Sequence, residues 1–192
     1  KNLSKLKMEG KQNETGKVWD YESNKNDPLA EKVKKDPSIV MTNPLMAKYL
    51  LDRIKFEEGD VVLEPCLGDG AFYNNFPKNT INKWCEINEG VDFLESTEAV
   101  DYTISNPPFV PRKLFWKFHE KAMEITKKEI YWLINLSALN VFTPKRLDEM
   151  TEAGWFIQDL HIVADKRWFG RYCFIKISKT PSTFITSHRK TF

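Results

Sequence analysis

The chain has 192 residues, a length that predicts a single domain with a sizeable core. Hydrophobic residues make up 41% of it and charged residues 29%, and no apolar run reaches the roughly 18 residues that a membrane span requires. Membrane-spanning and fibrous classes are therefore excluded, while the small net charge of +2 conceals an uneven distribution along the chain.

The basic charge is concentrated toward the C-terminus. Residues 41–160 contain 13 basic and 19 acidic residues, whereas residues 161–192 contain 7 basic residues and 1 acidic residue. An acidic body with one basic face can bind a polyanion locally, but a tail with several lysines can also be simply solvated. Charge alone leaves both interpretations open.

The composition predicts three parts. Residues 1–38 are polar and interrupted by Asp27-Pro28 and Asp36-Pro37, which is typical of a segment that buries too little apolar surface to fold by itself. We therefore expect an N-terminal extension with the composition of a disordered segment, a folded domain over 39–180 and a basic tail over 181–192.

Helical and strand patterns alternate through the folded part. After Thr42-Asn43-Pro44, the apolar spacing predicts a helix to about Lys55, and Val61-Val62-Leu63 predicts a buried strand. A second helix is expected over 113–127. The further candidate strands are 82–87, 102–105, 130–134, 155–163 and 172–177. This order predicts an α/β domain with a mainly parallel sheet and an antiparallel hairpin at its edge.

A glycine-containing turn follows the first strand. Gly68 and Gly70 let the backbone bend tightly and approach a ligand, as in the first turn of a nucleotide-binding fold, although a plain turn has the same pattern. The third glycine of the dinucleotide motif is replaced by Tyr73, and the chain has no GxxxxGK[ST] phosphate loop. NAD and ATP are therefore disfavoured as ligands.

Two acidic positions follow this turn. Glu86 lies 22 positions after Glu64, at the end of a predicted strand, where a carboxylate can bind the hydroxyl groups of a ribose. Asp92 and Phe93 are suitably placed to contact an adenine ring by a hydrogen bond and by packing. The alternatives are a surface glutamate, a loop acid and a core phenylalanine.

The most specific pattern is Asn106-Pro107-Pro108-Phe109, which follows the strand predicted over 102–105. Two prolines make the loop rigid and remove two donors, so the loop presents acceptor oxygens beside an aromatic ring. Such acceptors suit a planar amine, because they stabilise the positive charge that develops when its nitrogen attacks an electrophile. A rigid turn without a ligand is the alternative.

In this order and spacing, the motifs resemble those of class I S-adenosylmethionine-dependent amino-methyltransferases, and most of all the compact phage or viral N6-adenine DNA methyltransferases. The motifs that carry the resemblance are Glu64-Pro65-x-x-Gly68-x-Gly70, Glu86, Asp92-Phe93 and Asn106-Pro107-Pro108-Phe109. The resemblance covers about residues 41–178. It implies a Rossmann-like domain with a seven-stranded, mainly parallel sheet, and S-adenosyl-L-methionine as cofactor.

The resemblance also implies roles for the cofactor-binding residues. Glu64, Gly68 and Gly70, with Pro65 in the same motif, would line the methionine and sulfonium part. Glu86 would bind the ribose, and Asp92 with Phe93 the adenine, while Asn106 would lie beside the cofactor as well as the substrate.

The rigid loop would form the catalytic site. Asn106 and the carbonyl oxygen of Pro107 would accept hydrogen bonds from the target amine, Pro108 would keep the loop rigid and Phe109 would stack on the target ring. The methyl group would pass directly from sulfonium to nitrogen, without a covalent enzyme intermediate.

A second group of target contacts is expected near the C-terminus. The segment 166–172 interleaves three cations with three rings, which suits phosphates and a flipped or single-stranded base. Trp168, Phe169 and Arg171 are therefore candidate substrate-binding residues, although Trp168 can instead close the edge of the core. Only 20 residues follow Tyr172, too few for a separate target-recognition domain, so a partner subunit or low sequence specificity is expected.

The sequence thus predicts an adenine-specific DNA methyltransferase that binds nucleic acid and no membrane. Three alternatives remain open: methylation of adenine in RNA, N5-methylation of glutamine in a protein, and a catalytically silent subunit that keeps the fold. The three histidines are widely spaced, so no metal site is predicted. Three cysteines without CxxC spacing, and no evident targeting segment, favour the reducing cytoplasm or nucleus.

Overall fold

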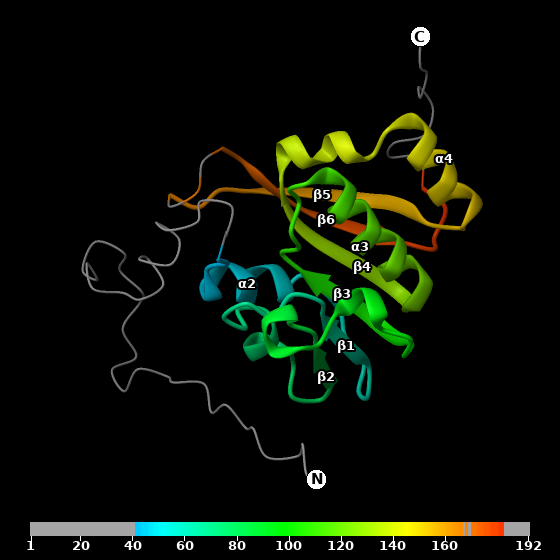
Figure 1. Cartoon of the computed structure of the whole chain (residues 1–192). Helices are drawn as coiled ribbons and strands as arrows, with labels where there is room; N and C mark the ends of the chain where they lie inside the picture. Colours follow the sequence, from blue (N-terminus) through cyan, green and yellow to red (C-terminus); the bar gives the residue numbers. More distant parts are fainter. Residues whose placement is uncertain (1–40, 167, 169, 183–192) are drawn as a thin grey trace. The chain divides into compact units, whose positions relative to one another are not determined.

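The computed structural model describes residues 41–166, 168 and 170–182 (Figure 1). All described residues belong to one unit of the chain, residues 38–192. The predicted extension over 1–38 and all but the first two residues of the predicted tail over 181–192 lie outside the described residues.

The described part of the chain forms a sheet of six strands in the order β2-β1-β3-β4-β6-β5. Strand β1 pairs in parallel with β2 and β3, and β3 pairs in parallel with β4, whereas β6 is antiparallel to both β4 and β5. The strands are β1 (Val61–Glu64), β2 (Ile81–Trp84), β3 (Val100–Ser105), β4 (Thr126–Asn135), β5 (Phe156–Val163) and β6 (Tyr172–Ser178). The predicted α/β fold with an antiparallel edge hairpin is confirmed.

The described residues form six strands rather than the seven that the resemblance implies. Only residues 85–99 separate β2 from β3, and they contain two short 3-10 helices, η3 (Ile87–Glu89) and η4 (Phe93–Glu95). A parallel strand needs a crossover connection of about a dozen residues on each side. This segment is therefore too short to add a strand beyond β2.

Within the described part of the chain, three α-helices pack on this sheet: α2 (Pro44–Leu51), α3 (Arg112–Ile125) and α4 (Pro144–Glu152). Helix α2 begins at Pro44, and the Asn43 side chain caps it by accepting from the Leu45 N–H at 2.9 Å. It ends before the expected Lys55, and α3 ends at Ile125 because β4 begins at the next residue. No helix in the described ranges is long and apolar enough to cross a membrane.

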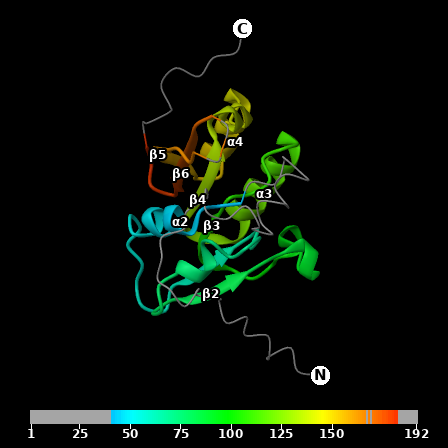
Figure 2. The ribbon, with the colours of Figure 1, turned by 90° about the vertical axis from the view of Figure 1, so that its left-hand side faces the viewer.

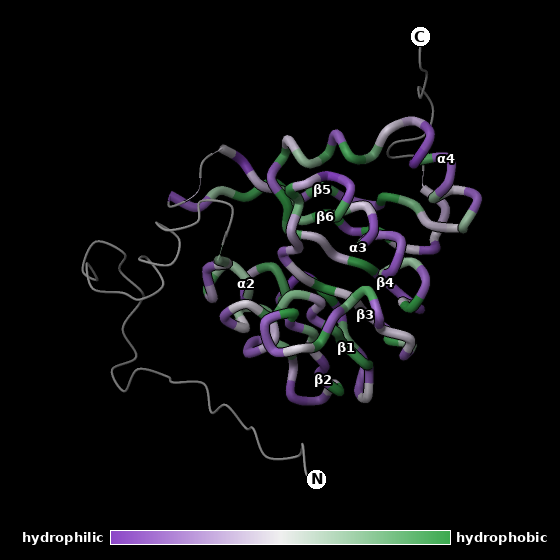
Figure 3. The backbone as a smooth tube through the Cα atoms, viewed as in Figure 1, coloured by the Kyte–Doolittle hydropathy of each residue, from purple (hydrophilic) through white to green (hydrophobic). Residues whose placement is uncertain are grey.

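The core lies on both faces of the sheet, as the central strand β4 illustrates. Ile130, Trp132 and Ile134 pack in the cluster with α3 and α4, whereas Tyr131 and Leu133 pack in the cluster with α2. Figure 2 shows α2 on one side of the sheet and α3 with α4 on the other, and Figure 3 shows hydrophobic residues along the strands. Burial on both faces explains why this strand has a continuous apolar sequence.

The topology brings the predicted motifs to one edge of the sheet. Strands β1, β2 and β3 are parallel, so their carboxyl ends lie together. The glycine loop, residues 65–72, follows β1, and Glu86 follows β2. The Asn106 loop, residues 106–109, follows β3. Ligands of open parallel sheets bind at this position, beyond the carboxyl ends of the strands.

Candidate active site

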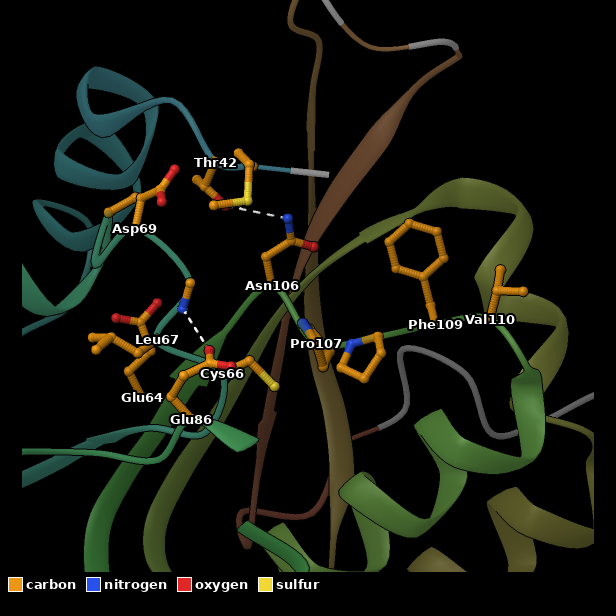
Figure 4. A pocket seen from close by; sticks show the side chains of 14 residues that line it. Thr42, Glu64, Cys66, Leu67, Asp69, Glu86, Asn106, Pro107, Phe109 and Val110 are labelled. Carbon is orange, nitrogen blue, oxygen red and sulfur yellow. Dashed lines mark hydrogen bonds between the residues drawn. The ribbon is translucent and has the colours of Figure 1, made fainter. Parts of the chain in front are cut away.

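A cavity of about 260 Å³ lies at this edge of the sheet. Seven of the predicted site residues line it: Glu64, Gly68, Glu86, Asn106, Pro107, Pro108 and Phe109. Seven further residues that were not predicted also line it: Met41, Thr42, Cys66, Leu67, Asp69, Ala71 and Val110. Figure 4 shows Asn106 with the acidic residues of the glycine loop on one side and Phe109 on the other.

The glycine loop has the backbone geometry that its sequence predicts. Gly68 and Gly70 have φ angles of +52° and +73°, in the left-handed region that favours glycine. Gly70 N–H donates to the carbonyl oxygen of Leu67 at 2.6 Å, which closes the turn. Pro65 and Gly70 are buried and shape the loop rather than the wall of the cavity.

Glu86 accepts three hydrogen bonds, one from the glycine loop and two from Asn88. One carboxylate oxygen accepts from Gly68 N–H at 2.9 Å, and the other accepts from the backbone N–H and the side-chain amide of Asn88 at 3.1 and 2.9 Å. A carboxylate has about four acceptor positions, so one remains for a ligand hydroxyl. The arrangement fixes Glu86 at the rim where the ribose contact is predicted.

Glu64 is a buried carboxylate at the base of the cavity, and it is 2% exposed. Its Oε2 accepts from Tyr73 N–H at 2.7 Å, which ties β1 to the end of the glycine loop. Burial raises the pKa of Glu64 well above its usual range, N–H groups of Tyr73 and Phe72 lower it in part, and the neighbouring Glu86 raises it further. A cationic group bound beside Glu64 would favour its ionised form.

The cysteine in this loop is not an activated nucleophile. Burial raises the pKa of the Cys66 thiol, and the negative charges of Glu86 and Glu64 raise it further. A thiol attacks through its thiolate, so these surroundings suppress covalent chemistry at Cys66. This agrees with the predicted direct transfer.

The structure corrects the predicted contact between Phe93 and adenine. The Phe93 side chain is 2% exposed and packs against Phe118, with 5.1 Å between the ring centroids, so it is a core residue. Asp92 Oδ1 accepts from Leu94 N–H at 2.8 Å and caps η4. Neither residue lines the cavity, and a ligand contact through Asp92 stays a prediction.

The Asn106 loop presents its amide to the cavity in a fixed orientation. The Asn106 Nδ2 group donates to Thr42 Oγ1 at 3.2 Å, and Oδ1 is shielded from solvent. Figure 4 shows the amide nitrogen pointing toward Thr42 and the oxygen pointing the other way. Pro107 and Pro108 continue the same wall of the cavity.

An aromatic row extends from Phe109 toward the hairpin. The Phe109 and Tyr172 rings meet edge to face with 6.2 Å between centroids, and the Tyr172 and Trp168 rings are 4.3 Å apart. Tyr172 is 4% exposed and belongs to the core, and Trp168 packs against it, as the alternative of closing the edge of the core predicts. Substrate binding by Trp168 stays a prediction. Arg171 is exposed beside this row, whereas Phe169 lies outside the described residues.

Five of the seven lining residues that were missed adjoin a predicted motif, so their position in the sequence was a usable signal. They are Cys66, Leu67, Asp69 and Ala71 beside the two glycines, and Val110 directly after Phe109. Met41 and Thr42 precede α2, and the fold brings them beside Asn106, more than 60 residues along the chain. No local pattern predicts this contact.

Comparison with known proteins gives the fold. No protein-family model matches the chain, and no curated protein sequence is significantly similar to it. Among solved structures, a Listeria monocytogenes protein provisionally assigned to the class I S-adenosylmethionine-dependent methyltransferases has a TM-score of 0.59 and 12% identity, covering 85% of this chain and 69% of that chain. The chain has the class I methyltransferase fold.

Two further methyltransferases with this fold differ in substrate. Magnesium protoporphyrin IX methyltransferase from Synechocystis PCC 6803, solved with bound S-adenosylmethionine, has a TM-score of 0.55 and 7% identity, covering 82% of this chain and 94% of that chain. The E. cuniculi Mtq2–Trm112 complex, which methylates the eRF1 translation termination factor, has a TM-score of 0.54 and 16% identity, covering 73% and 98%. The methyltransferase fold therefore leaves the substrate to be argued from the site.

Proposed function

We propose that this protein transfers a methyl group from S-adenosylmethionine to the N6 amino group of adenine in DNA. The observation that carries the proposal is that one cavity is lined both by the acidic glycine loop and by the Asn106 loop. The first suits a cationic cofactor and the second suits a planar amine. Their position side by side brings donor and acceptor together.

The donor set of the cavity fits the cofactor. Glu64, Asp69 and Glu86 line one side, and their charges complement the ammonium and sulfonium groups of S-adenosylmethionine. Glu86 keeps an acceptor position for the ribose hydroxyls, and Gly68 exposes a backbone without a side chain. When bound, the cofactor supplies an electrophilic methyl group on sulfur.

The Asn106 loop would prepare the amine for attack. The Asn106 Oδ1 atom and the Pro107 carbonyl oxygen accept its two N–H bonds, which favours a pyramidal nitrogen and stabilises the charge that develops on it. With the cofactor bound, the amine nitrogen held by these two oxygens would take the methyl group that the sulfonium supplies and would lose one proton to solvent. No protein nucleophile is required, which agrees with the suppressed reactivity of Cys66.

The surroundings of Phe109 favour a nucleic-acid substrate. Exposed basic residues are close to it, or to its partner Tyr172, along the chain: Arg112 and Lys113 begin α3 soon after Phe109, and Arg171 directly precedes Tyr172. Cations beside stacking rings bind the phosphates and bases of an unpaired strand. We propose DNA as the polymer, with a partner subunit supplying further recognition.

Methyl transfer from labelled cofactor tests this function directly. We expect label in duplex or single-stranded DNA and little in RNA or a protein extract, with N6-methyladenine identified in the product by mass spectrometry. Label in RNA alone would identify adenine in RNA as the substrate, and methylglutamine in the protein extract would contradict the nucleic-acid assignment. Cofactor binding without any transfer would indicate a silent subunit.

Gly68→Ala should weaken cofactor binding. Its φ of +52° costs an alanine about 1 kcal/mol of folding free energy, and the added methyl group occupies the wall of the cavity. We expect an affinity loss of roughly tenfold, from the cost of inserting one methyl group into a packed contact. Isothermal titration calorimetry measures the affinity and thermal denaturation measures the stability.

Gly154→Ala is the matched control. Gly154 has a φ of +77° with nothing near an added Cβ, and it lies outside the cavity. Its alanine variant should lose similar stability and keep the cofactor affinity. Equal affinities in the two variants would argue against a cofactor at Gly68.

A further inference from the structure

We infer that Thr42 is a positioning residue for the reaction, because it sets the orientation of the Asn106 amide. The inference rests on the proposed function and adds a residue to it. The side-chain amide of asparagine has an acceptor oxygen and a donor nitrogen that exchange places when the group rotates by half a turn. Only one orientation accepts hydrogen bonds from an amine.

The structure shows that orientation. Asn106 Nδ2 donates to Thr42 Oγ1 at 3.2 Å, and this hydrogen bond holds the nitrogen away from the position of the amine. Both residues line the cavity, and Figure 4 shows them side by side, with a dashed line marking this hydrogen bond. Loss of this acceptor removes one hydrogen bond that favours this orientation. In the opposite orientation the N–H donors of the amide would face the N–H donors of the amine, which is repulsive.

Thr42 is itself anchored on both sides. Asn43 Oδ1 caps α2 through Leu45 N–H, and Asn43 Nδ2 donates to Asp165 at 3.3 Å, in the connection between β5 and β6. Before it, the Met41 side chain lies against Gly68 of the glycine loop. The backbone that carries the Thr42 hydroxyl is therefore held by contacts with α2, with the connection between β5 and β6 and with the glycine loop.

The residue also connects two sides of the proposed site. The segment 41–43 contacts the glycine loop through Met41, the catalytic loop through Thr42 and the β5–β6 connection through Asn43. This connection carries Trp168 of the aromatic row. The segment therefore holds the Asn106 amide in a constant position relative to both the proposed cofactor site and the proposed substrate site.

Thr42→Val tests the inference, because valine keeps the shape of threonine and lacks its hydroxyl. We expect kcat for DNA methylation to fall roughly tenfold, the effect of losing one hydrogen bond between neutral groups, with little change in KM or cofactor affinity. Thr42→Ser should restore most of kcat. Thr143→Val is the control, since Thr143 caps the distant helix α4 and should affect stability alone.

Two further readouts separate positioning from a merely structural role. In the Asn106→Ala background, Thr42→Val should have no further effect on kcat, because its action passes through the Asn106 amide. By nuclear magnetic resonance, the Asn106 side-chain amide signal should shift in Thr42→Val and stay in place in Thr42→Ser. The second measurement requires no methyl transfer.

Several outcomes would overturn the inference. One is an Asn106 amide signal that stays unchanged in Thr42→Val. Another is a loss of kcat that Thr42→Val adds in full in the Asn106→Ala background. A third is a weaker cofactor affinity in Thr42→Val at constant kcat. The last would make Thr42 a cofactor ligand instead. If the unmodified protein transfers no methyl group while the amide signal still depends on Thr42, the proposed function fails and the positioning contact stands.

Discussion

Asn106→Ala is expected to lower the rate of adenine methylation by about 10²- to 10³-fold, the usual effect of removing one preorganised group that stabilises developing charge. Alanine has no acceptor oxygen at this position of the cavity wall. Cofactor affinity should change much less, since the acidic glycine loop stays intact. Single-turnover transfer from labelled cofactor measures the rate, and calorimetry measures the affinity.

The control for this variant is Asn140→Ala. Asn140 is exposed, its Nδ2 donates only locally to the carbonyl oxygen of Ser137, and it lies outside the cavity. Its alanine variant should methylate at the normal rate. Unchanged methylation in Asn106→Ala would remove Asn106 from the mechanism, and a loss of cofactor binding of the same size as the rate loss would make it a cofactor residue.

Glu64→Gln should weaken cofactor binding and stabilise the free protein. The carboxylate is buried at the base of the cavity, where it would face the ammonium group of the cofactor. Removing one partner of a buried charge pair typically costs on the order of 10²-fold in affinity. In the free protein, glutamine still accepts from Tyr73 N–H and buries no charge, so the melting temperature at pH 8 should rise by about 3 °C, equivalent to roughly 1 kcal/mol.

The pH dependence of stability follows from the raised pKa of Glu64. A carboxyl group whose pKa is higher in the folded than in the unfolded state contributes stability that is fully present below the unfolded pKa of about 4.5 and is lost as the pH rises through the folded value. The stability gain of Glu64→Gln should therefore grow from about pH 5 upward. Cofactor affinity of the unmodified protein should increase over the same range, because binding requires the ionised group.

Glu129→Gln is the matched control for Glu64→Gln. Glu129 accepts from Lys176 at 2.7 Å and from the Tyr131 hydroxyl at 2.6 Å, away from the cavity. Glu129→Gln should lower the melting temperature and leave cofactor affinity unchanged, whereas Glu64→Gln should raise the melting temperature and weaken cofactor binding. A lower melting temperature for Glu64→Gln at pH 8 would contradict the proposed cost of burying this carboxylate.

Local sequence patterns predicted most of the fold. All six candidate strands are present, because the apolar runs of buried parallel strands and the alternating helices are encoded within short segments. The seventh strand was implied by resemblance alone, and the short connection between β2 and β3 leaves no room for it. The length of that connection, readable from the sequence, was the signal against it.

Local sequence was enough to predict that the glycine loop, Glu86 and the Asn106 loop follow neighbouring strands, because backbone angles and loop rigidity depend on neighbouring residues. The core position of the Phe93 ring and the contact between Tyr172 and Phe109 became evident in the folded chain. Folding also brought Thr42 to Asn106, 64 positions along the chain. Burial and side-chain contact depend on which distant segments pack together, and patterns within a short segment do not encode that.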